Sequence, residues 1–396
     1  MTDINAIPEI RFKGFSDTWE QRKLRELCNI TTGKLDANAM VSDGQYDFYT
    51  SGIDVFKIDV AAFEGPAITI AGNGASVGYM HLADGKFNAY QRTYVLTDFL
   101  ADRQFLNVAI GNELPNKIQE EVRGSGIPYI VLNMLTDLAI PFPSHEEQYA
   151  IGVYFQQLDT LITLHQRKLG KITKIKMAML EKMFPKNGSD VPEIRFKGFT
   201  DAWEQRKLGE IVTEVKRTDE NSSAPVMMIT ANDGFINQSD RYSTNNAGQS
   251  LKKYILLEKG ELAYNHGASK LRPYGSCFAL TMEEKARIPF VYHCFSANED
   301  NPEFLSIVLN GKNVERQLRR IVSSGARMDG LLNISFEEYT SIPILIPGRS
   351  EQNKIADYFR NLDTLITLHQ RELEKLQNIK KSMLEKMFPT SKSKEM

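Results

Sequence analysis

Two stretches of the chain carry apolar residues at alternating steps of four and three. The first series runs from Ile151 to Met183 and the second from Ile355 to Met387, and eight of the ten positions in each are apolar. This spacing is typical of helices that pack along a coiled-coil seam, and a proline follows each series. The pattern predicts two long helices, 147–185 and 351–389, that pair with each other rather than lie singly on a globular core.

The two helices belong to a larger internal repeat. Two pairs of segments match: 8–26 with 192–210 at 16 of 19 positions, and 147–185 with 351–389 at 26 of 39. The stretches between them hardly resemble each other, and the second is 20 residues longer. A period near 200 residues indicates domain duplication rather than a solenoid. The chain therefore predicts one frame, used twice, that holds two different inserts.

The inserts read as mixed α/β. Short β-rich runs broken by Gly, Asn and Pro are found at 67–72, 93–99, 253–264 and 289–295, with helices expected near 105–110 and 303–320 and closing strands at 138–143 and 341–347. The second insert begins after the first helix and ends before the second helix. Because a compact domain usually has its ends close together, we expect the two helices to be antiparallel, with each spanning about 55–60 Å.

The expected fold is therefore of the α+β class. Two globular mixed α/β domains are separated by a long antiparallel two-helix coiled coil, with an internal pseudo-two-fold repeat. The expected segments are an N-terminal repeat segment (1–26), a first insert (27–146), a central helix (147–185), a linker with the second repeat segment (186–210), a second insert (211–350), a C-terminal helix (351–389) and a tail (390–396).

Composition indicates an ordinary cytoplasmic protein. The formal charge is −2, with 42% apolar and 25% charged residues. The three cysteines are odd in number and lack metal-like spacing, so we expect free thiols in a reducing compartment. The N-terminus lacks an apolar signal region and no run approaches 18 apolar residues, so neither a signal peptide nor a membrane span is expected.

Enzyme motifs occur only in incomplete form. Residues 74–78 match G-x-S-x-G, but the corresponding 267–271 lack the last glycine and no supporting hydrolase pattern accompanies them. No Gly-Lys pair completes a P-loop. Asn301 is expected to be a helix N-cap, with Pro302 in the first turn. His165 and His369 fall on the helix seam, where a polar layer that sets the register is expected instead of a metal ligand. We therefore predict no catalytic and no metal site.

Corresponding loops of the two inserts are the candidate nucleic-acid contacts. Residues 73–76 align with 266–269, and 124–126 with 323–325; Gly allows close backbone approach, and Ser or Asn can donate to phosphates or base edges. The candidates are Asn73, Gly74, Ser76, Tyr90, Gln91, Arg92, Arg123 and Ser125 in the first insert, and His266, Gly267, Ser269, Lys270, Arg272, Ser324 and Arg327 in the second, with Arg316, Arg319 and Arg320 nearby. Ordinary turns and solvated charges are an equally good interpretation of each single residue. Between Cys28 and Ile140, 7 Lys and Arg face 13 Asp and Glu, so this insert would have to gather its basic residues on one face.

The helices also suggest contacts with a partner. The stretch LDTLITLHQR occurs at 158–167 and again at 362–371, and it includes positions that point away from the seam. A seam requires a match only at its inward positions, so matched outward residues suggest two equivalent docking sites. The candidates are Asp159, Thr163 and Gln166, with Asp363, Thr367 and Gln370.

Taken together, these motifs resemble the specificity subunit of type I restriction–modification systems. The resemblance rests on the twice-used opener PEIRFKGF-x-D-x-WEQRKL, on inserts that end in Ile-Pro and a Glu-Gln pair, and on helices that end in MLEKMFP. It implies that the inserts are target recognition domains for the two halves of a bipartite DNA site. It also implies two methyltransferase subunits docked on the helices, with restriction subunits joined through the complex.

The resemblance further implies that this chain catalyses nothing alone. S-adenosylmethionine, ATP and Mg²⁺ would belong to partner subunits, and the chain itself would hold no cofactor. The alternative is a stand-alone DNA-binding or scaffolding protein without restriction–modification partners. A lone repressor is normally a small homodimer with a basic reading helix, which this chain does not show. Copurification of a methyltransferase would distinguish the two.

Overall fold

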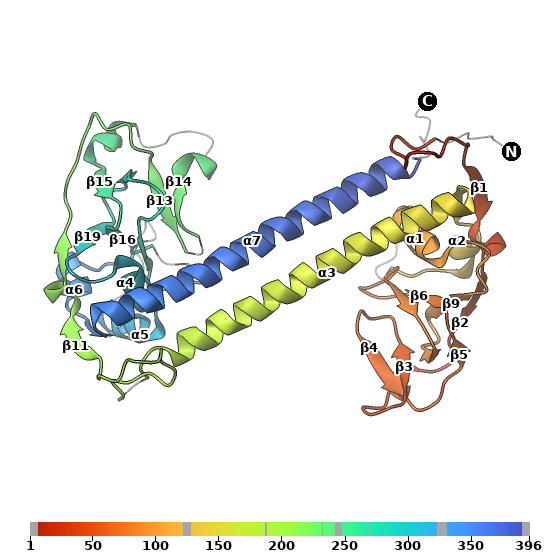
Figure 1. Cartoon of the computed structure of the whole chain (residues 1–396), viewed down its shortest axis with the longest axis horizontal. Coiled ribbons are helices and arrows are strands. Elements are labelled where there is room, and N and C mark those ends of the chain that lie inside the picture. The colour runs from red at the N-terminus through yellow and green to blue at the C-terminus, as the bar shows by residue number, and fades with distance from the viewer. Residues whose placement is uncertain are drawn as a thin grey trace. The chain divides into compact units, whose positions relative to one another are not determined.

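The computed structural model describes residues 7–121, 128–186, 188–231, 233–241, 248–267, 269–322 and 331–389. It forms two compact units: unit 1 comprises Met1–Leu169 and His369–Met396, and unit 2 comprises Gly170–Leu368. Two long helices, α3 (His145–Lys182) and α7 (Arg349–Met387), each contribute to both units (Figure 1). Each unit therefore contains one insert and a segment of both helices.

In the described part of unit 1 there are three sheets, and two α-helices besides the long ones. Strands β1 (Glu20–Lys23) and β10 (Ala139–Phe142) form an antiparallel pair. One four-stranded sheet has the order β2 (Asn29–Thr32), β9 (Thr93–Thr97), β6 (Ala67–Ala71), β7 (Met80–Ala83), and the other has the order β4 (Val55–Ile58), β3 (Tyr46–Tyr49), β8 (Lys86–Ala89), β5 (Phe63–Glu64). The helices are α1 (Arg103–Glu121) and α2 (Leu132–Thr136).

Unit 2 follows a related plan. Strands β11 (Glu204–Lys207) and β20 (Pro343–Ile346) pair antiparallel, and a four-stranded sheet has the order β12 (Val212–Glu214), β19 (His293–Ala297), β16 (Leu262–Asn265), β17 (Ser276–Ala279). Two further pairs join β13 (Met227–Thr230) with β14 (Gly234–Asn237), and β15 (Ile255–Glu258) with β18 (Lys285–Ile288). The short helices are α4 (Pro302–Leu309), α5 (Lys312–Ile321) and α6 (Phe336–Thr340).

The central sheets of the two inserts thus have the same strand order, although the sequences of the inserts hardly match. The order β2-β9-β6-β7 in unit 1 corresponds to β12-β19-β16-β17 in unit 2, and all neighbours in both sheets are antiparallel. The expected mixed α/β inserts are confirmed. The helix expected over 303–320 is instead two helices, because the chain turns at Asn310 and Gly311 before α5 begins. Asn301 does cap α4, since its side chain accepts from the Phe304 N–H at 3.0 Å.

The long helices pack against each other in antiparallel directions. In unit 1 the N-terminal part of α3 lies along the C-terminal part of α7, with Nδ1 of His165 3.1 Å from Nδ1 of His369. Lys380 donates there to Asp159. In unit 2 the C-terminal part of α3 lies along the start of α7, and Lys176 donates to Asp363. The predicted pairing of the helices is therefore confirmed.

In each unit the Glu of the repeated Glu-Gln pair forms a buried ion pair, and the Gln contacts the start of a helix. Arg11 binds Glu147 through two hydrogen bonds of 2.9 and 2.6 Å, and Arg195 binds Glu351 at 2.8 and 2.7 Å. The adjacent Gln148 accepts from the Asp102 N–H at the start of α1, as Gln352 accepts from the Asn301 N–H at α4. These contacts explain why the opener and the Glu-Gln pair recur together.

The segment PEIRFKGF lies against a helix end in both units. In unit 2 the Ile194 N–H donates to the Lys182 carbonyl near the end of α3, at 2.9 Å. In unit 1 the Ile10 N–H donates to the Lys386 carbonyl near the end of α7, at 3.1 Å. Among the described residues, none of the helices is both long and apolar enough to cross a membrane.

Candidate nucleic-acid interface

The β6–β7 loop of unit 1 meets two other segments at its base. The Gly72 N–H donates to the Arg92 carbonyl at 2.9 Å, and the Gly72 carbonyl accepts from the Ile130 N–H at 2.7 Å. Gly72 allows this approach because a Cβ there would lie 2.2 Å from the Arg92 oxygen. The structure therefore brings the loop that contains Asn73 beside the one that contains Gln91.

The side chains at this junction offer polar groups to solvent. Gln91 and Arg92 are exposed, while Asn73, Ser76 and Tyr90 are half-buried. The Asn73 Oδ1 accepts from the Ser51 hydroxyl at 2.6 Å, which orients the amide while its nitrogen can still donate. Gly74 has a φ of +83°, and a Cβ there would meet no atom within 4 Å, so backbone strain and not crowding favours glycine.

In unit 2 the corresponding residue His266 is buried. Its exposed fraction is 6%, and its ring nitrogens lie 2.8 Å from the Leu332 carbonyl oxygen and 2.6 Å from that of Val291. The ring is therefore engaged inside the domain and holds the base of the loop. The signal that the sequence offered was only its alignment with Asn73, and alignment does not reveal burial.

The rest of this loop turns back on itself. The Ser269 hydroxyl accepts from the Arg272 N–H at 3.0 Å, and the Arg272 guanidinium donates to the Asn310 carbonyl at 2.8 Å. Lys270 is exposed, and Gly267 pairs with Leu331 across an isolated bridge. Arg272 is thus tied to the turn between α4 and α5, whereas Lys270 points to solvent.

Four further candidates, Arg123, Ser125, Ser324 and Arg327, and the glycines beside them, lie outside the described residues. The described residues that follow these two gaps in the chain contact the loops at 73–76 and 266–269. The Pro128 carbonyl accepts from the Gly74 N–H at 3.2 Å, and the Leu332 N–H donates to the His266 carbonyl at 2.9 Å. The same pairing of chain segments therefore occurs in both units.

Two histidines near these loops carry too little positive charge to attract a phosphate. Burial lowers the pKa of His81, whose ring lies 5.1 Å from that of Tyr49. Burial likewise lowers the pKa of His293, whose ring stacks on His266 at 5.1 Å. Both rings are therefore neutral near pH 7, and positive charge at these loops comes from arginine and lysine.

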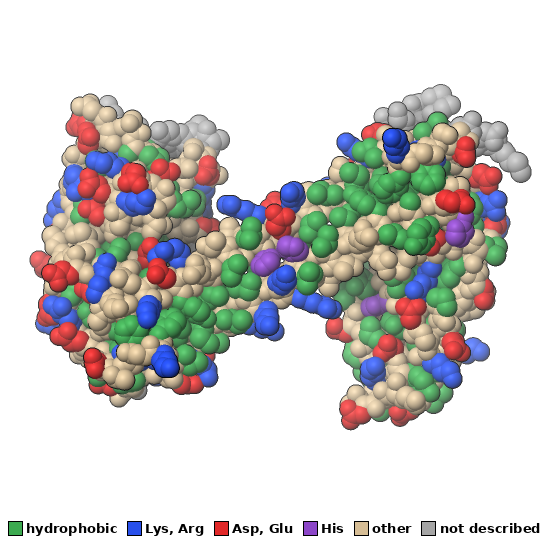
Figure 2. All heavy atoms as spheres, in the orientation of Figure 1, with side chains coloured by type: hydrophobic (Ala, Val, Ile, Leu, Met, Phe, Trp, Pro, Cys, Tyr) green, Lys and Arg blue, Asp and Glu red, His purple; other side chains and the backbone are tan. Residues whose placement is uncertain are grey.

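The expected docking residues on the helices divide into two groups. Asp159 and Asp363 form ion pairs with lysines of the other helix, so their recurrence is explained within the chain. The other four are exposed: Thr163, Gln166, Thr367 and Gln370. Sequence reasoning missed two pairs of exposed leucines elsewhere on the same helices, Leu161 and Leu164 in unit 1 and Leu365 and Leu368 in unit 2, which are 42–51% exposed. Figure 2 shows apolar side chains exposed along the helices in this view.

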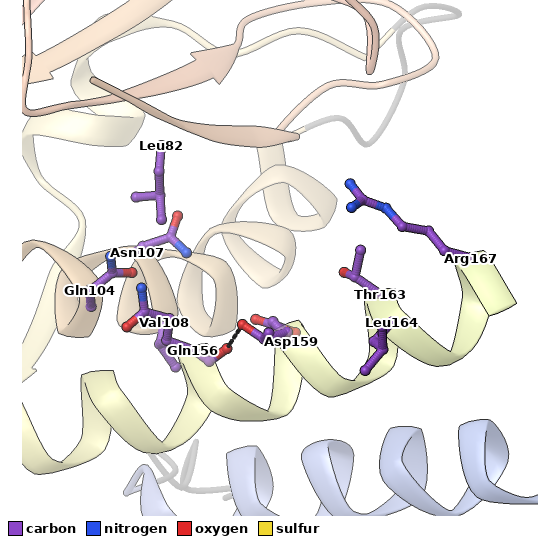
Figure 3. A pocket seen from close by; sticks show the side chains of 10 residues that line it. Leu82, Gln104, Asn107, Val108, Gln156, Asp159, Thr163, Leu164 and Arg167 are labelled. Carbon is purple, nitrogen blue, oxygen red and sulfur yellow. Dashed lines mark hydrogen bonds between the residues drawn. The ribbon is translucent and has the colours of Figure 1, made fainter. Parts of the chain in front are cut away.

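A hollow of about 380 Å³ lies beside the docking residues of unit 1. Figure 3 shows Gln104 and Asn107 on α1 on one side, and Gln156, Asp159 and Arg167 on α3 on the other. The hollow also includes Thr163 and Leu164. Because the hollow is open on one side, it suits contact with another protein surface better than enclosure of a small ligand.

Comparison with known proteins identifies the family of residues 16–174. Residues 16–174 match the family model described as type I restriction modification DNA specificity domain. The chain is 40% identical over 157 residues, which is 40% of its own length, to the type I restriction enzyme EcoDI specificity subunit of Escherichia coli. It is 23% identical over 295 residues, 67% of its length, to the MjaVIII specificity subunit of Methanocaldococcus jannaschii. The matched stretches cover 34% and 65% of these relatives, so the chain spans less than two thirds of each.

The fold carries the likeness over the remaining residues. A type I restriction–modification S subunit from M. genitalium superposes with a TM-score of 0.65, covering 97% of this chain and 99% of that one at 18% identity. Residues 16–174 belong to the family of type I restriction modification DNA specificity domains, and the fold of the whole chain is similar to that of the M. genitalium S subunit. The family model extends over the first insert and most of α3.

Proposed function

We propose that this chain reads a bipartite DNA target, one half with each insert, and docks two methyltransferase subunits. The recognition domains would be 27–146 and 211–350, and the spacer helices 147–185 and 351–389. The repeat segments (1–26 and 186–210) would complete the frame, and 390–396 a tail. S-adenosylmethionine would serve the methyltransferases, and ATP with Mg²⁺ the restriction subunits. The assembly would act on DNA in the cytoplasm.

The observation that carries this proposal is that both units contain the same arrangement of loops, with different side chains in each. Both units place the loop after the third strand of the central sheet against a segment that follows α1 or α5. Asn73 occupies one such loop, whereas Lys270 and Arg272 occupy the other. Base edges are read by specific side chains, so two readers of one design with different residues suit two different half-sites.

Exchange of one insert tests whether each insert recognises its own half-site independently of the other. Residues 27–146 are replaced by the insert of another specificity subunit, and the methylated motif is determined by methylome sequencing. We expect one half of the motif to change and the other to persist. The matched control replaces 8–26 by the sequence of 192–210, which differs at three positions, and should leave the motif intact. A change in both halves, or in neither, would contradict the proposal.

Docking of two methyltransferases is supported by the equivalent exposed residues of the two helices. Leu161 and Leu164 recur as Leu365 and Leu368, and exposed apolar groups of this kind commonly mark a protein contact. We expect native mass measurement of the purified complex to show two methyltransferase copies per chain. One copy at saturation would contradict equivalent sites. Purification without any methyltransferase would instead favour a stand-alone DNA-binding or scaffolding protein.

A further inference from the structure

Helix α5 of unit 2 has one buried and one basic face. Val314 and Leu318 are 1% and 3% exposed and face the core. The exposed side chains at helical spacing are basic: Lys312, Arg316, Arg319 and Arg320. At 100° per residue, these four lie together on the side opposite to the two core residues.

The charges on this face are available to an external anion. Within the described ranges, no ion pair joins any of the four side chains to a carboxylate. The Arg316 guanidinium instead contacts the Asn313 side chain and the Lys312 carbonyl, both in α5. Exposed cations that lack internal acidic partners form an electrostatic surface for a polyanion.

Both ends of α5 are connected to the candidate reading loop. At its N-terminal end, Arg272 of that loop donates to the Asn310 carbonyl in the turn before the helix. Beyond its C-terminal end the described chain resumes at Leu331, which pairs with Gly267 of the same loop. The basic helix therefore flanks the segment that would read bases in the second half-site.

Among the described residues of the first insert, no helix has such a basic face. Leu114 and Ile118 of α1 are buried as Val314 and Leu318 are, which aligns the two helices with an offset of 200. The positions equivalent to the four basic residues hold Asn112, Asn116, Gln119 and Glu120. The whole inserts differ in the same sense: 27–146 has 7 Lys and Arg against 14 Asp and Glu, whereas 211–350 has 16 of each.

We propose that the basic face of α5 binds the phosphate backbone of duplex DNA beside the half-site read by the second domain. This rests on the proposed function, since it requires that the second insert lies on DNA. The second domain then supplies most of the sequence-independent affinity, and the acidic first domain contributes base reading with few phosphate contacts. Each phosphate neutralised by a cation releases counterions, so such affinity falls steeply with salt.

The test measures DNA affinity of the subunit assembled with its methyltransferase over a series of KCl concentrations. Two duplexes are used, one with the methylated motif and one with a scrambled sequence. The variant R319Q/R320Q retains helix-forming side chains and removes two charges. We expect weaker binding to both duplexes alike, a slope of log K against log salt that is shallower by about two, and an unchanged methylated motif.

A matched control removes two charges elsewhere in unit 2. Lys259 and Lys285 are 51% and 53% exposed and pair with Glu284 and Glu258 at the β15–β18 strand pair. The variant K259Q/K285Q has the same change in net charge, and we expect it to alter the salt slope much less. Circular dichroism and the melting temperature confirm that both variants are folded.

Several outcomes would overturn the proposal. An unchanged slope in folded R319Q/R320Q would place α5 away from the DNA. A changed motif would make these arginines readers of bases, and loss of the methyltransferase during purification would make α5 a protein contact. If the unaltered complex binds neither duplex, the proposed DNA-reading function itself fails, which is a distinct result.

Discussion

Glu351 holds the Arg195 guanidinium at a site almost closed to solvent. The Glu351 side chain is 2% exposed and that of Arg195 is 13% exposed. The substitution Glu351→Gln leaves a charged arginine without its counter-ion, and breaking a buried pair in this way costs about 3–5 kcal/mol. We expect urea unfolding to show a loss of that size, with the first change in probes of unit 2.

A solvent-exposed pair in the same unit provides the control. Arg360 binds Glu303 with side-chain exposures of 52% and 30%, and such pairs contribute about 0–1 kcal/mol. Glu303→Gln should therefore lower the free energy of unfolding far less than Glu351→Gln. Equal losses in the two variants would show that burial of the Glu351 pair does not govern its contribution.

The buried histidines make stability depend on pH. The pKa of both His81 and His293 is lowered by burial, below the value of about 6.5 for an unfolded histidine. The unfolded chain therefore binds more protons than the folded chain once the pH falls through about 6.5, and the free energy of unfolding decreases. We expect a smaller decrease between pH 7.5 and 5.5 in His81→Gln/His293→Gln than in the unaltered chain, measured by urea unfolding. Identical decreases would show that these rings do not contribute.

At this scale the sequence predicted positions better than roles. The heptad pattern placed Lys176 on the seam and Asp363 off it, but it could not show that a long lysine side chain extends to a carboxylate of the other helix. Asp363 therefore looked like a docking residue. The burial of His266 could not be predicted for a related reason, because its two carbonyl contacts come from segments 25 and 66 residues away.

The helix pair presents a test at the scale of elements. Lys380 and Asp159 join α7 to α3, with side chains 32% and 46% exposed. Reversal of one charge in Lys380→Glu sets like charges together, and we expect a loss of about 0.5–1 kcal/mol because the site is partly solvated. The double variant K380E/D159K should recover most of that loss in thermal unfolding. Additive losses would mean that the two side chains do not interact.

Element positions could be predicted wherever a local pattern was strong. β6 is buried at all five residues and was visible as AITIA, and the long helices were visible through more than four heptads. The sequence did not predict the break between α4 and α5, because the apolar positions of the two helices continue across Gly311. The sheet β4-β3-β8-β5 was also missed, since its parallel β3–β8 contact joins strands about 40 residues apart.

The continuous helices suggest a test at the scale of the whole molecule. If their length sets the spacing of the two half-sites, seven-residue insertions after Leu169 and after Leu373 keep the seam in register and add about 10.5 Å, or about three base pairs. We expect methylome sequencing to show unchanged half-sites and a longer gap between them. An active variant whose motif keeps its original gap would show that the helices do not set the spacing.

The main hydrophobic core of each unit draws on both halves of the chain. The main core of unit 1 includes Met387 at the end of α7 and Phe388 after it, and that of unit 2 includes Met183 with Phe184 packed against it. A single protease cut between Pro185 and Pro192 would therefore yield two fragments, each lacking the residues that complete its core unless the other remains bound. A nicked subunit should migrate as one particle on gel filtration and as two bands after denaturation. An intact backbone at this linker is therefore not required to keep this protein folded.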